Sequence, residues 1–265
     1  MAALDVGAKL PVRRPDVRYF TDGTGVRLRA AEQRTIEGLL EPYGRSISPP
    51  SPTGRTFAAM GEGLLTDLER PLPHLDLIIL AYAEPDITVA EVAGCYLADL
   101  CPGTPTGFSV SGPGVGAPFT ALRILQAARA AGEIGDGAVF AFDQSASLYR
   151  AKADAERDCA VLLTIDDRDP DRLVLEIQPE IQIDDLTDIP FAGPPGARFI
   201  AGRELTERLG SAPSDRTWTP VVTPGCTAIW AALAAHWSPE QHIVVAEYDC
   251  VDQILYQALL SPVSE

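Results

Sequence analysis

The chain has 265 residues, 46% of them hydrophobic, and a formal net charge of −16. This length and composition allow a large buried core, which excludes disorder as the default, and the acidity leaves no basic footprint for nucleic acid. No run approaches the roughly 20 apolar residues that cross a bilayer, and Met1 to Pro15 lacks the order of a signal peptide, so we expect no membrane partner and a cytoplasmic location.

The first hundred residues contain one strongly predicted strand. Weak strands between Val17 and Leu28 surround a turn at Thr21 to Gly25, and a proline-rich loop, residues 46–52, precedes a helix at 56–68. Leu75 to Tyr82 is a nearly continuous apolar run. Such a run is typical of a parallel strand that is covered on both faces.

Residues 89–166 alternate between helices and strands. The pattern predicts a helix at 89–100, a strand at 107–111, a glycine turn at 112–117, an alanine-rich helix at 118–131, and strands at 138–142 and 158–166. This alternation indicates a layered α/β protein with helices on the faces of a sheet.

The last hundred residues are less regular. Leu173 to Ile183 predicts one long strand, and the turn-rich stretch from Asp184 to Pro220 holds only a short helix near Gly202 to Leu209. A strand at 219–222, a helix at 226–237 and a strand at 241–247 then repeat the strand-loop-helix-strand order of the first half, before residues 251–260 close the chain.

The charge is unevenly spread along the chain. The first 55 residues carry nine lysines and arginines against six aspartates and glutamates. An acidic partner could therefore dock only near this segment, whose arginines include Arg13, Arg14, Arg18, Arg27, Arg29 and Arg34. The preferred interpretation is that these arginines pair with the acidic remainder.

Nothing in the sequence indicates a metal or a cofactor. The five cysteines are scattered and never spaced as CxxC, which argues against disulfides and zinc; they are Cys95, Cys101, Cys159, Cys226 and Cys250. The acidic clusters at Asp166 to Asp171 and Asp184–Asp185 lack calcium-loop spacing and are interpreted as solvated turns. The spacing Gly112-x-Gly114-x-Gly116 does not match a dinucleotide loop.

The order and spacing of these elements from Thr56 to Ile165 resemble the N-terminal half of the thiolase superfamily, particularly the initiating type of β-ketoacyl-acyl carrier protein synthase. The segments that carry the resemblance are Leu75 to Ala81, Glu84-Pro85-Asp86, Gly107 to Ser111, the glycine turn, Gly137 to Ala141 and Asp158 to Leu163. The resemblance implies a layered αβαβα fold with mixed five-stranded sheets. It also implies two halves, residues 1–165 and a shortened 166–265, in one compact unit.

The shortened second half lacks a long amphipathic helix between Asp184 and Pro220. The sheet face left bare would need cover from another chain or from the loop itself. A dimer is the simplest cover, and dimers are what the resemblance implies.

In the family that the chain resembles, the glycine turn presents a nucleophilic cysteine at the start of a buried helix. Here the matching position is Gly114 or Val115, and neither side chain attacks a thioester. The turn, Gly112, Gly114, Val115 and Gly116, would then form an acyl pocket and oxyanion turn without a thiol. The hydroxyl nearest to this position is that of Ser111, which is the alternative nucleophile. Ser109 lies two residues before it.

The second half of that family supplies a histidine, and an asparagine or second histidine, to the nucleophile. The corresponding loop here, Val222 to Thr227, has neither, and we expect His74, His236 and His242 to lie away from the active cleft. Cys226 falls at a predicted helix N-terminus facing Gly114, where a thiol pKa could be lowered. The alternative is a small buried residue that packs the loop.

Three functions follow from the resemblance. The first is a non-condensing partner subunit in fatty acid or polyketide assembly, as a homodimer or paired with a full-length ketosynthase. The second is an acyltransferase or condensing enzyme that uses Ser111 or Cys226 with coenzyme A or acyl carrier protein thioesters. The third is a ligand-binding module without turnover, so whether the chain is an enzyme stays open.

Overall fold

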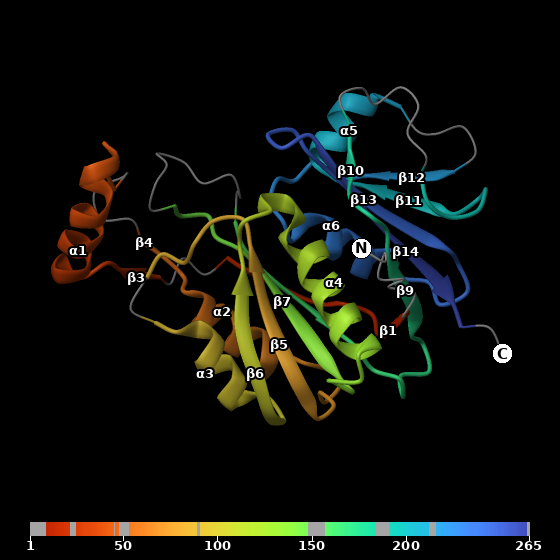
Figure 1. Ribbon diagram of the computed structural model, residues 1–265, viewed down its shortest axis with the longest axis horizontal. Helices are drawn as coiled ribbons and strands as arrows, with labels where there is room; N and C mark the ends of the chain where they lie inside the picture. The colour runs from red at the N-terminus through yellow and green to blue at the C-terminus, as the bar shows by residue number, and fades with distance from the viewer. Residues whose placement is uncertain are drawn as a thin grey trace.

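The computed structural model describes residues 9–21, 25–44, 46–47, 53–88, 91–147, 157–183, 191–211 and 216–263. Two β-sheets face each other, with helices between them and on both outer sides (Figure 1). The predicted αβαβα layering is therefore confirmed.

The first sheet holds five strands among the described residues. In spatial order they are β2 (Asp16–Phe20), β8 (Asp158–Thr164), β7 (Gly137–Asp143), β5 (Leu75–Tyr82) and β6 (Gly103–Val110). The pairs β2–β8 and β8–β7 are antiparallel, and β7–β5 and β5–β6 are parallel. β5 is the predicted parallel strand with the predicted bounds, and it is almost wholly buried because helices cover both of its faces.

The second sheet repeats this topology and adds two short strands. Its strands are β1 (Leu10–Val12), β9 (Leu173–Ile177), β14 (Ile254–Pro262), β13 (Ile243–Asp249), β11 (Arg198–Ala201), β12 (Thr217–Pro220) and β10 (Ile181–Gln182). From β9 to β12 the succession of antiparallel and parallel pairs is that of the first sheet. The expectation of five strands is thus met in the first sheet, while seven described strands form the second because β1 and β10 join it.

Helices complete the layers. The described helices of the body are α2 (Phe57–Thr66), α3 (Ala93–Leu100), α4 (Ala117–Ala130), α5 (Arg203–Leu209) and α6 (Ala228–Ala235). α4 and α6 lie between the sheets and pack into the central core, as Figure 1 shows for α4. α2 and α3 cover the outer face of the first sheet, and α5 covers that of the second.

The described residues on the outer face of the second sheet are covered by the chain itself. Phe199, Val244 and Tyr248 are fully buried there. Leu205 of α5 and the ring of Phe191, from the segment that precedes β11, pack against them. The sequence analysis expected this face to be covered either by another chain or by the loop itself. The cover observed is a segment of the chain itself, which consists of the loop before β11 and helix α5.

Several other predictions need correction. Residues 173–183 form two strands, because Gln178, Pro179 and Glu180 interrupt them. The helix expected at 89–100 begins at Ala93, and residues 89 and 90 lie outside the described residues. Strand β11 and a first helix, α1 (Ala30–Leu40), were not predicted.

Helix α1 stands apart from the layered body with the short strands β3 (Val26–Arg27) and β4 (Thr53–Gly54), at the left of Figure 1. A single 3-10 turn, η1 (Glu41–Tyr43), follows α1. Only Ile36 of α1 is buried, in a small cluster with Leu28, Ile47 and Ile87. Arg27, Arg29 and Arg34 are exposed on this arm.

Arginines of the first segment do pair with carboxylates. Arg18 contacts Asp67 at 2.7 Å, and Arg13, only 1% exposed, binds Asp16 at 2.9 Å. The partner of Arg13 lies in the same segment, so the predicted pairing with the acidic remainder holds for Arg18 but not for Arg13.

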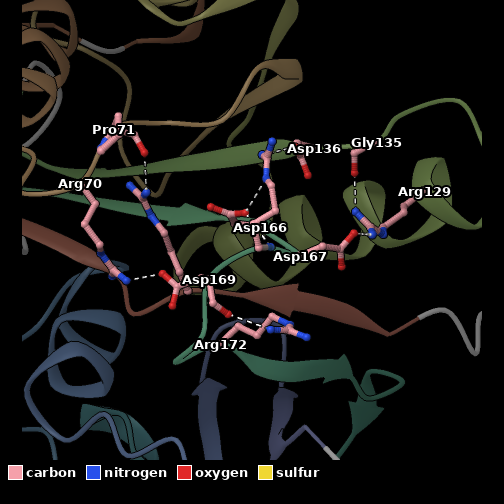
Figure 2. A network of polar contacts seen from close by, with 11 residues as sticks. Arg70, Pro71, Arg129, Gly135, Asp136, Asp166, Asp167, Asp169 and Arg172 are labelled. Carbon is pink, nitrogen blue, oxygen red and sulfur yellow. Dashed lines mark hydrogen bonds and ion pairs between the residues drawn. The ribbon is translucent and has the colours of Figure 1, made fainter.

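A polar network closes the end of the first sheet where β5 and β7 begin (Figure 2). Arg70 pairs with Asp169, whose side chain is 3% exposed, and Arg129 pairs with Asp167. Arg168 binds both Asp136 at 2.8 Å and Asp166 at 3.2 Å.

The interpretation of residues 166–171 as solvated carboxylates is therefore wrong for Asp169, which is enclosed and ion-paired, whereas Asp166 is partly exposed and pairs with the exposed Arg168. Asp184 and Asp185 lie outside the described residues.

Candidate functional site

The glycine turn leads from strand β6 to helix α4 through a 3-10 turn, η2 (Gly114–Gly116). Gly114 has φ 55°, and a Cβ there would lie 3.2 Å from Asp249 Oδ2. A Cβ at Gly116 would overlap the Tyr256 ring at 2.3 Å. The turn thus packs closely against the end of β13 and against β14, and no side chain fits at either glycine without rearrangement.

The matching loop of the second half leads into α6 and packs in a similar way. Gly225 has φ 110°, and a Cβ there would lie 2.3 Å from Asp143 Oδ2. Asp143 ends β7 as Asp249 ends β13. The glycine loop of each half therefore lies against the carboxyl group at the end of the corresponding strand of the other half.

Asp143 caps the start of α6. Its Oδ1 accepts a hydrogen bond from the Cys226 N–H at 3.0 Å, and its Oδ2 accepts from the Thr227 N–H at 2.7 Å and the Thr227 hydroxyl at 2.6 Å. Burial raises the pKa of Asp143, and these three donors oppose the rise. The electropositive start of the helix is thus occupied by a carboxyl group of the chain itself.

A cavity of about 600 Å³, here called the central cavity, lies where the two loops meet. Val115 from the glycine turn and Pro224 and Gly225 from the second loop line it. The remaining walls come from the segments that end β5, β7 and β13 and from α5. Carboxyl ends of parallel strands are where layered α/β proteins commonly place ligands.

The walls of the central cavity carry more acidic than basic side chains. The charged residues that line it, besides Asp143, are Glu84, Glu204, Glu207, Glu247, Arg203 and Arg208. Arg203 donates to Glu207 at 2.8 Å, and the Arg208 guanidinium stacks over the Tyr248 ring at 5.0 Å. The cavity therefore favours a ligand portion without negative charge.

Glu247 is an acid of this cavity whose pKa is strongly raised. It is 4% exposed, and burial raises its pKa from 4.5 to about 8. The Tyr248 N–H donates to it at 2.9 Å, and its carboxyl also faces N–H groups at the start of α5. Gly202 leaves it the necessary space, since a Cβ there would lie 1.7 Å from Oε2. Near neutral pH Glu247 holds its proton.

The predicted site residues separate in the structure. Val115 lines the central cavity, whereas Ser111 and Gly112 are exposed and outside it. Cys226 is 1% exposed and donates from its thiol to the Phe142 carbonyl at 3.4 Å. Of the two interpretations of Cys226, the small buried residue that packs the loop is the one observed; burial, followed by the charge of Asp143, raises its pKa well above its ordinary value.

The three histidines lie away from the central cavity, as predicted. His74 precedes β5 and His242 precedes β13, at the strand ends opposite the cavity. His236 caps the far end of α6. A histidine base for a nucleophile at the cavity is therefore absent from the described residues that line it.

Sequence analysis missed Cys250, Glu204 and Asp143 as members of the site. Cys250 follows β13 directly, and a position just after a buried parallel strand was the available signal. Its neighbours in the cavity come from α5 and the glycine turn, far apart in the sequence. In the described ranges no three His, Cys, Asp or Glu side chains converge as metal ligands, and no helix has the length and apolar character of a membrane span.

Two matched sheets and two buried helices that begin at one cavity define a protein of thiolase-like fold. ChlB3, an acyltransferase, has this fold at a TM-score of 0.61 and 12% identity, over 97% of this chain and 98% of its own. AbyA1, a tetronic acid condensing enzyme, matches at 0.60 and 12% identity over 95% and 99%. The 3-oxoacyl-(acyl carrier protein) synthase III, FabH, of Pseudomonas aeruginosa PAO1 matches at 0.54 and 11% over 97% and 99%. No family model and no curated protein matches the sequence.

Proposed function

We propose that this chain is a non-condensing protein of thiolase-like fold that binds acyl thioesters as a partner subunit in fatty acid or polyketide assembly. The observation that carries the proposal is the central cavity, into which the glycine turn directs Val115. A valine side chain has no nucleophile, and no histidine lines the described walls. The pocket can hold a thioester, but the turn brings no thiol to it and its described walls bring no histidine for carbon–carbon bond formation.

The start of α6 supports the same conclusion. In a condensing site the N–H groups at a helix start are free to favour an anion. Here Asp143 already accepts the N–H groups of Cys226 and Thr227. An anion could reach these two N–H groups only by displacing a buried carboxyl group, so the loop before α6 offers a substrate oxyanion no free donor at these positions.

An exposed sheet edge supports the partner role. Among the described residues β6 pairs with β5 on one side only, and most of the residues of β6 are exposed. Apolar side chains gather at this edge and on the adjoining helix α3: Tyr96 is 41%, Leu100 41% and Phe108 39% exposed. An open strand with apolar neighbours is a surface that a second subunit would cover. The exposed Arg27, Arg29 and Arg34 offer an acidic carrier protein a basic contact.

The test uses the purified full chain. Light scattering after gel filtration should give the mass of a dimer, alone or with a co-expressed cysteine-bearing ketosynthase, and Phe108→Glu should shift the mass to that of a monomer. Incubation with acetyl-CoA and malonyl-CoA should yield no condensation product. A condensation product, or a covalent acyl adduct at Ser111 or Cys226 in intact-mass spectrometry, would contradict the proposal.

A further inference from the structure

One carboxyl group in the wall of the central cavity is buried and has no role in the proposed function. Glu247, near the end of β13, lines the cavity and is 4% exposed. It follows Ile243 and Val245 at alternate positions, and these two residues belong to the core between the sheets. The side chain of Glu247 therefore lies on the inner face of the second sheet, away from bulk water.

The backbone around Glu247 holds its carboxyl group in place. The Tyr248 N–H donates to Oε1 at 2.9 Å, and N–H groups of Arg203 and Leu205, at the start of α5, also face the carboxyl. Position 202 must be glycine for this arrangement, since a Cβ there would lie 1.7 Å from Oε2. The described partners of the carboxyl are thus N–H donors, none of which can accept its proton.

The charged and titratable side chains around Glu247 come from several elements. Those of α5 are Arg203, Glu204, Glu207 and Arg208. Those of β13, of the turn after it and of the facing position on β14 are Tyr248, Asp249, Cys250 and Tyr256. Those after β5 and at the end of β7 are Glu84 and Asp143. Acidic groups outnumber the two arginines.

Neither arginine balances a charge on Glu247. Arg203 donates to Glu207 at 2.8 Å, and the Arg208 guanidinium stacks over the Tyr248 ring at 5.0 Å. In the part of the chain that the structure describes, Glu247 forms no ion pair. A buried carboxyl without a counter-charge, among other acids, is neutral near pH 7. The pKa of about 8 that burial gives Glu247 agrees with this.

A neutral carboxyl is a hydrogen-bond donor, and the buried part of this wall has few others. Gln144 is 6% exposed, but its Nε2 already donates to the Arg55 carbonyl at 2.6 Å and to Asp86 Oδ1 at 2.8 Å. Both amide protons of Gln144 are therefore used. The arginines that line the cavity are exposed. The proton of Glu247 is thus the buried side-chain donor that a ligand would meet.

We infer that Glu247, in its neutral form, donates a hydrogen bond to a carbonyl oxygen of an uncharged acyl-pantetheine ligand in the central cavity, and that ionisation of this carboxyl releases the ligand. The inference rests on the acyl thioester ligand of the proposed function. When the proton leaves for solvent, the carboxylate and the ligand carbonyl face each other as two acceptors. Neither is then satisfied in a site that excludes water, so the ligand loses affinity.

Calorimetry on the full chain tests this with the octanoyl amide of pantetheine, in which N–H replaces the thioester sulfur. This probe is uncharged and resists alkaline hydrolysis. If only the neutral carboxyl binds, the Kd should rise about 30-fold between pH 6.5 and pH 9.5, because ionisation near pH 8 leaves about 3% of the protein competent. Binding at pH 8 should take up about half a proton, read from the binding enthalpy in buffers of different ionisation enthalpy.

Glu247→Gln separates a titrating donor from a structural neighbour. The amide keeps N–H donors in the same place but does not ionise, so its Kd should change less than about threefold between the two pH values, without proton uptake. At pH 9.5 this variant should bind at least about tenfold more tightly than wild type. Glu133→Gln, the same change at an exposed position outside the cavity, should keep the wild-type pH dependence. Wild-type pH dependence in Glu247→Gln would overturn the inference.

Infrared difference spectra of the wild-type protein give a readout that needs no variant to fold. The C=O stretch of a protonated carboxyl should move to lower frequency when the probe is added at pH 6.5, because its O–H then donates to the ligand. An unmoved band while the probe binds would overturn the inference. Binding of the probe without pH dependence would also overturn it and would leave the proposed function standing. Absence of binding at both pH values would overturn both.

Discussion

Asp143→Ala tests the cap of α6. The substitution strands three buried donors, the Cys226 N–H, the Thr227 N–H and the Thr227 hydroxyl, which now lie 2.6–3.0 Å from the carboxyl oxygens. Each buried donor left without an acceptor costs about 1–3 kcal/mol, and partial relaxation brings the expected total to about 3–6 kcal/mol. Urea denaturation at pH 7, followed by far-ultraviolet circular dichroism, measures the loss in unfolding free energy.

Two further variants make this measurement decisive. Asp143→Asn keeps one carbonyl acceptor and should lose about 1–3 kcal/mol, which is measurable even if the alanine variant unfolds. Asp249→Ala is the matched control at the equivalent strand end, and its partners include the N–H of Val251, whose side chain is 85% exposed. Water can replace the carboxylate there, so the control should lose no more than about 1 kcal/mol. If Asp143→Ala costs no more than Asp249→Ala, the capping argument is wrong.

Three other predictions concern the cavity, the polar network and the thiols. Burial raises the pKa of Glu247 from 4.5 to about 8. The contribution of Glu247 to the unfolding free energy is therefore complete below pH 4.5 and is lost as the pH rises through 8. The loss is at most about 5 kcal/mol. Unfolding free energies at pH 5 and pH 9 should therefore differ less in Glu247→Gln than in wild type, and equal differences would contradict the burial argument. Asp169→Asn breaks the enclosed ion pair with Arg70 and should lower the unfolding free energy by about 2 kcal/mol in urea titrations, whereas an unchanged midpoint would show the pair to be neutral. Ellman's reagent should reach only the two exposed cysteines in the folded protein and all five in urea, and a third thiol reacting without urea would contradict the described burial.

The fold could be predicted where local pattern and tertiary environment agree. Leu75 to Tyr82 is apolar throughout because both faces of β5 are covered, and the alanine-rich segment of α4 lies between two sheets. Helix α1 was missed because Ile36 is its only buried residue, so it shows no apolar face. Strand β11 has four residues and depends on its parallel neighbours β12 and β13.

The site was harder to predict because its members come from separate elements. The start of α6 suggested a lowered pKa for Cys226, but the carboxyl that fills this position, Asp143, lies 83 residues earlier in the chain. Cys250 carried no motif, since Glu204 of α5, which accepts its N–H, and Val115 of the glycine turn, which lines the same cavity, come near it only after folding. The position of Val115 could be predicted from the sequence, because the resemblance placed this residue in the nucleophile turn.

The most direct test of the account installs a thiol where the turn enters the central cavity. Val115→Cys, in a Cys250→Ser background, places a sulfur in the turn before α4, where the helix start favours a thiolate. Gly112→Cys in the same background is the control, because position 112 is exposed in the same turn and outside the cavity. Intact-mass spectrometry with octanoyl-CoA should show an acyl adduct at position 115 and little or none at position 112. Equal or absent labelling at the two positions would contradict the claim that this cavity accepts acyl thioesters.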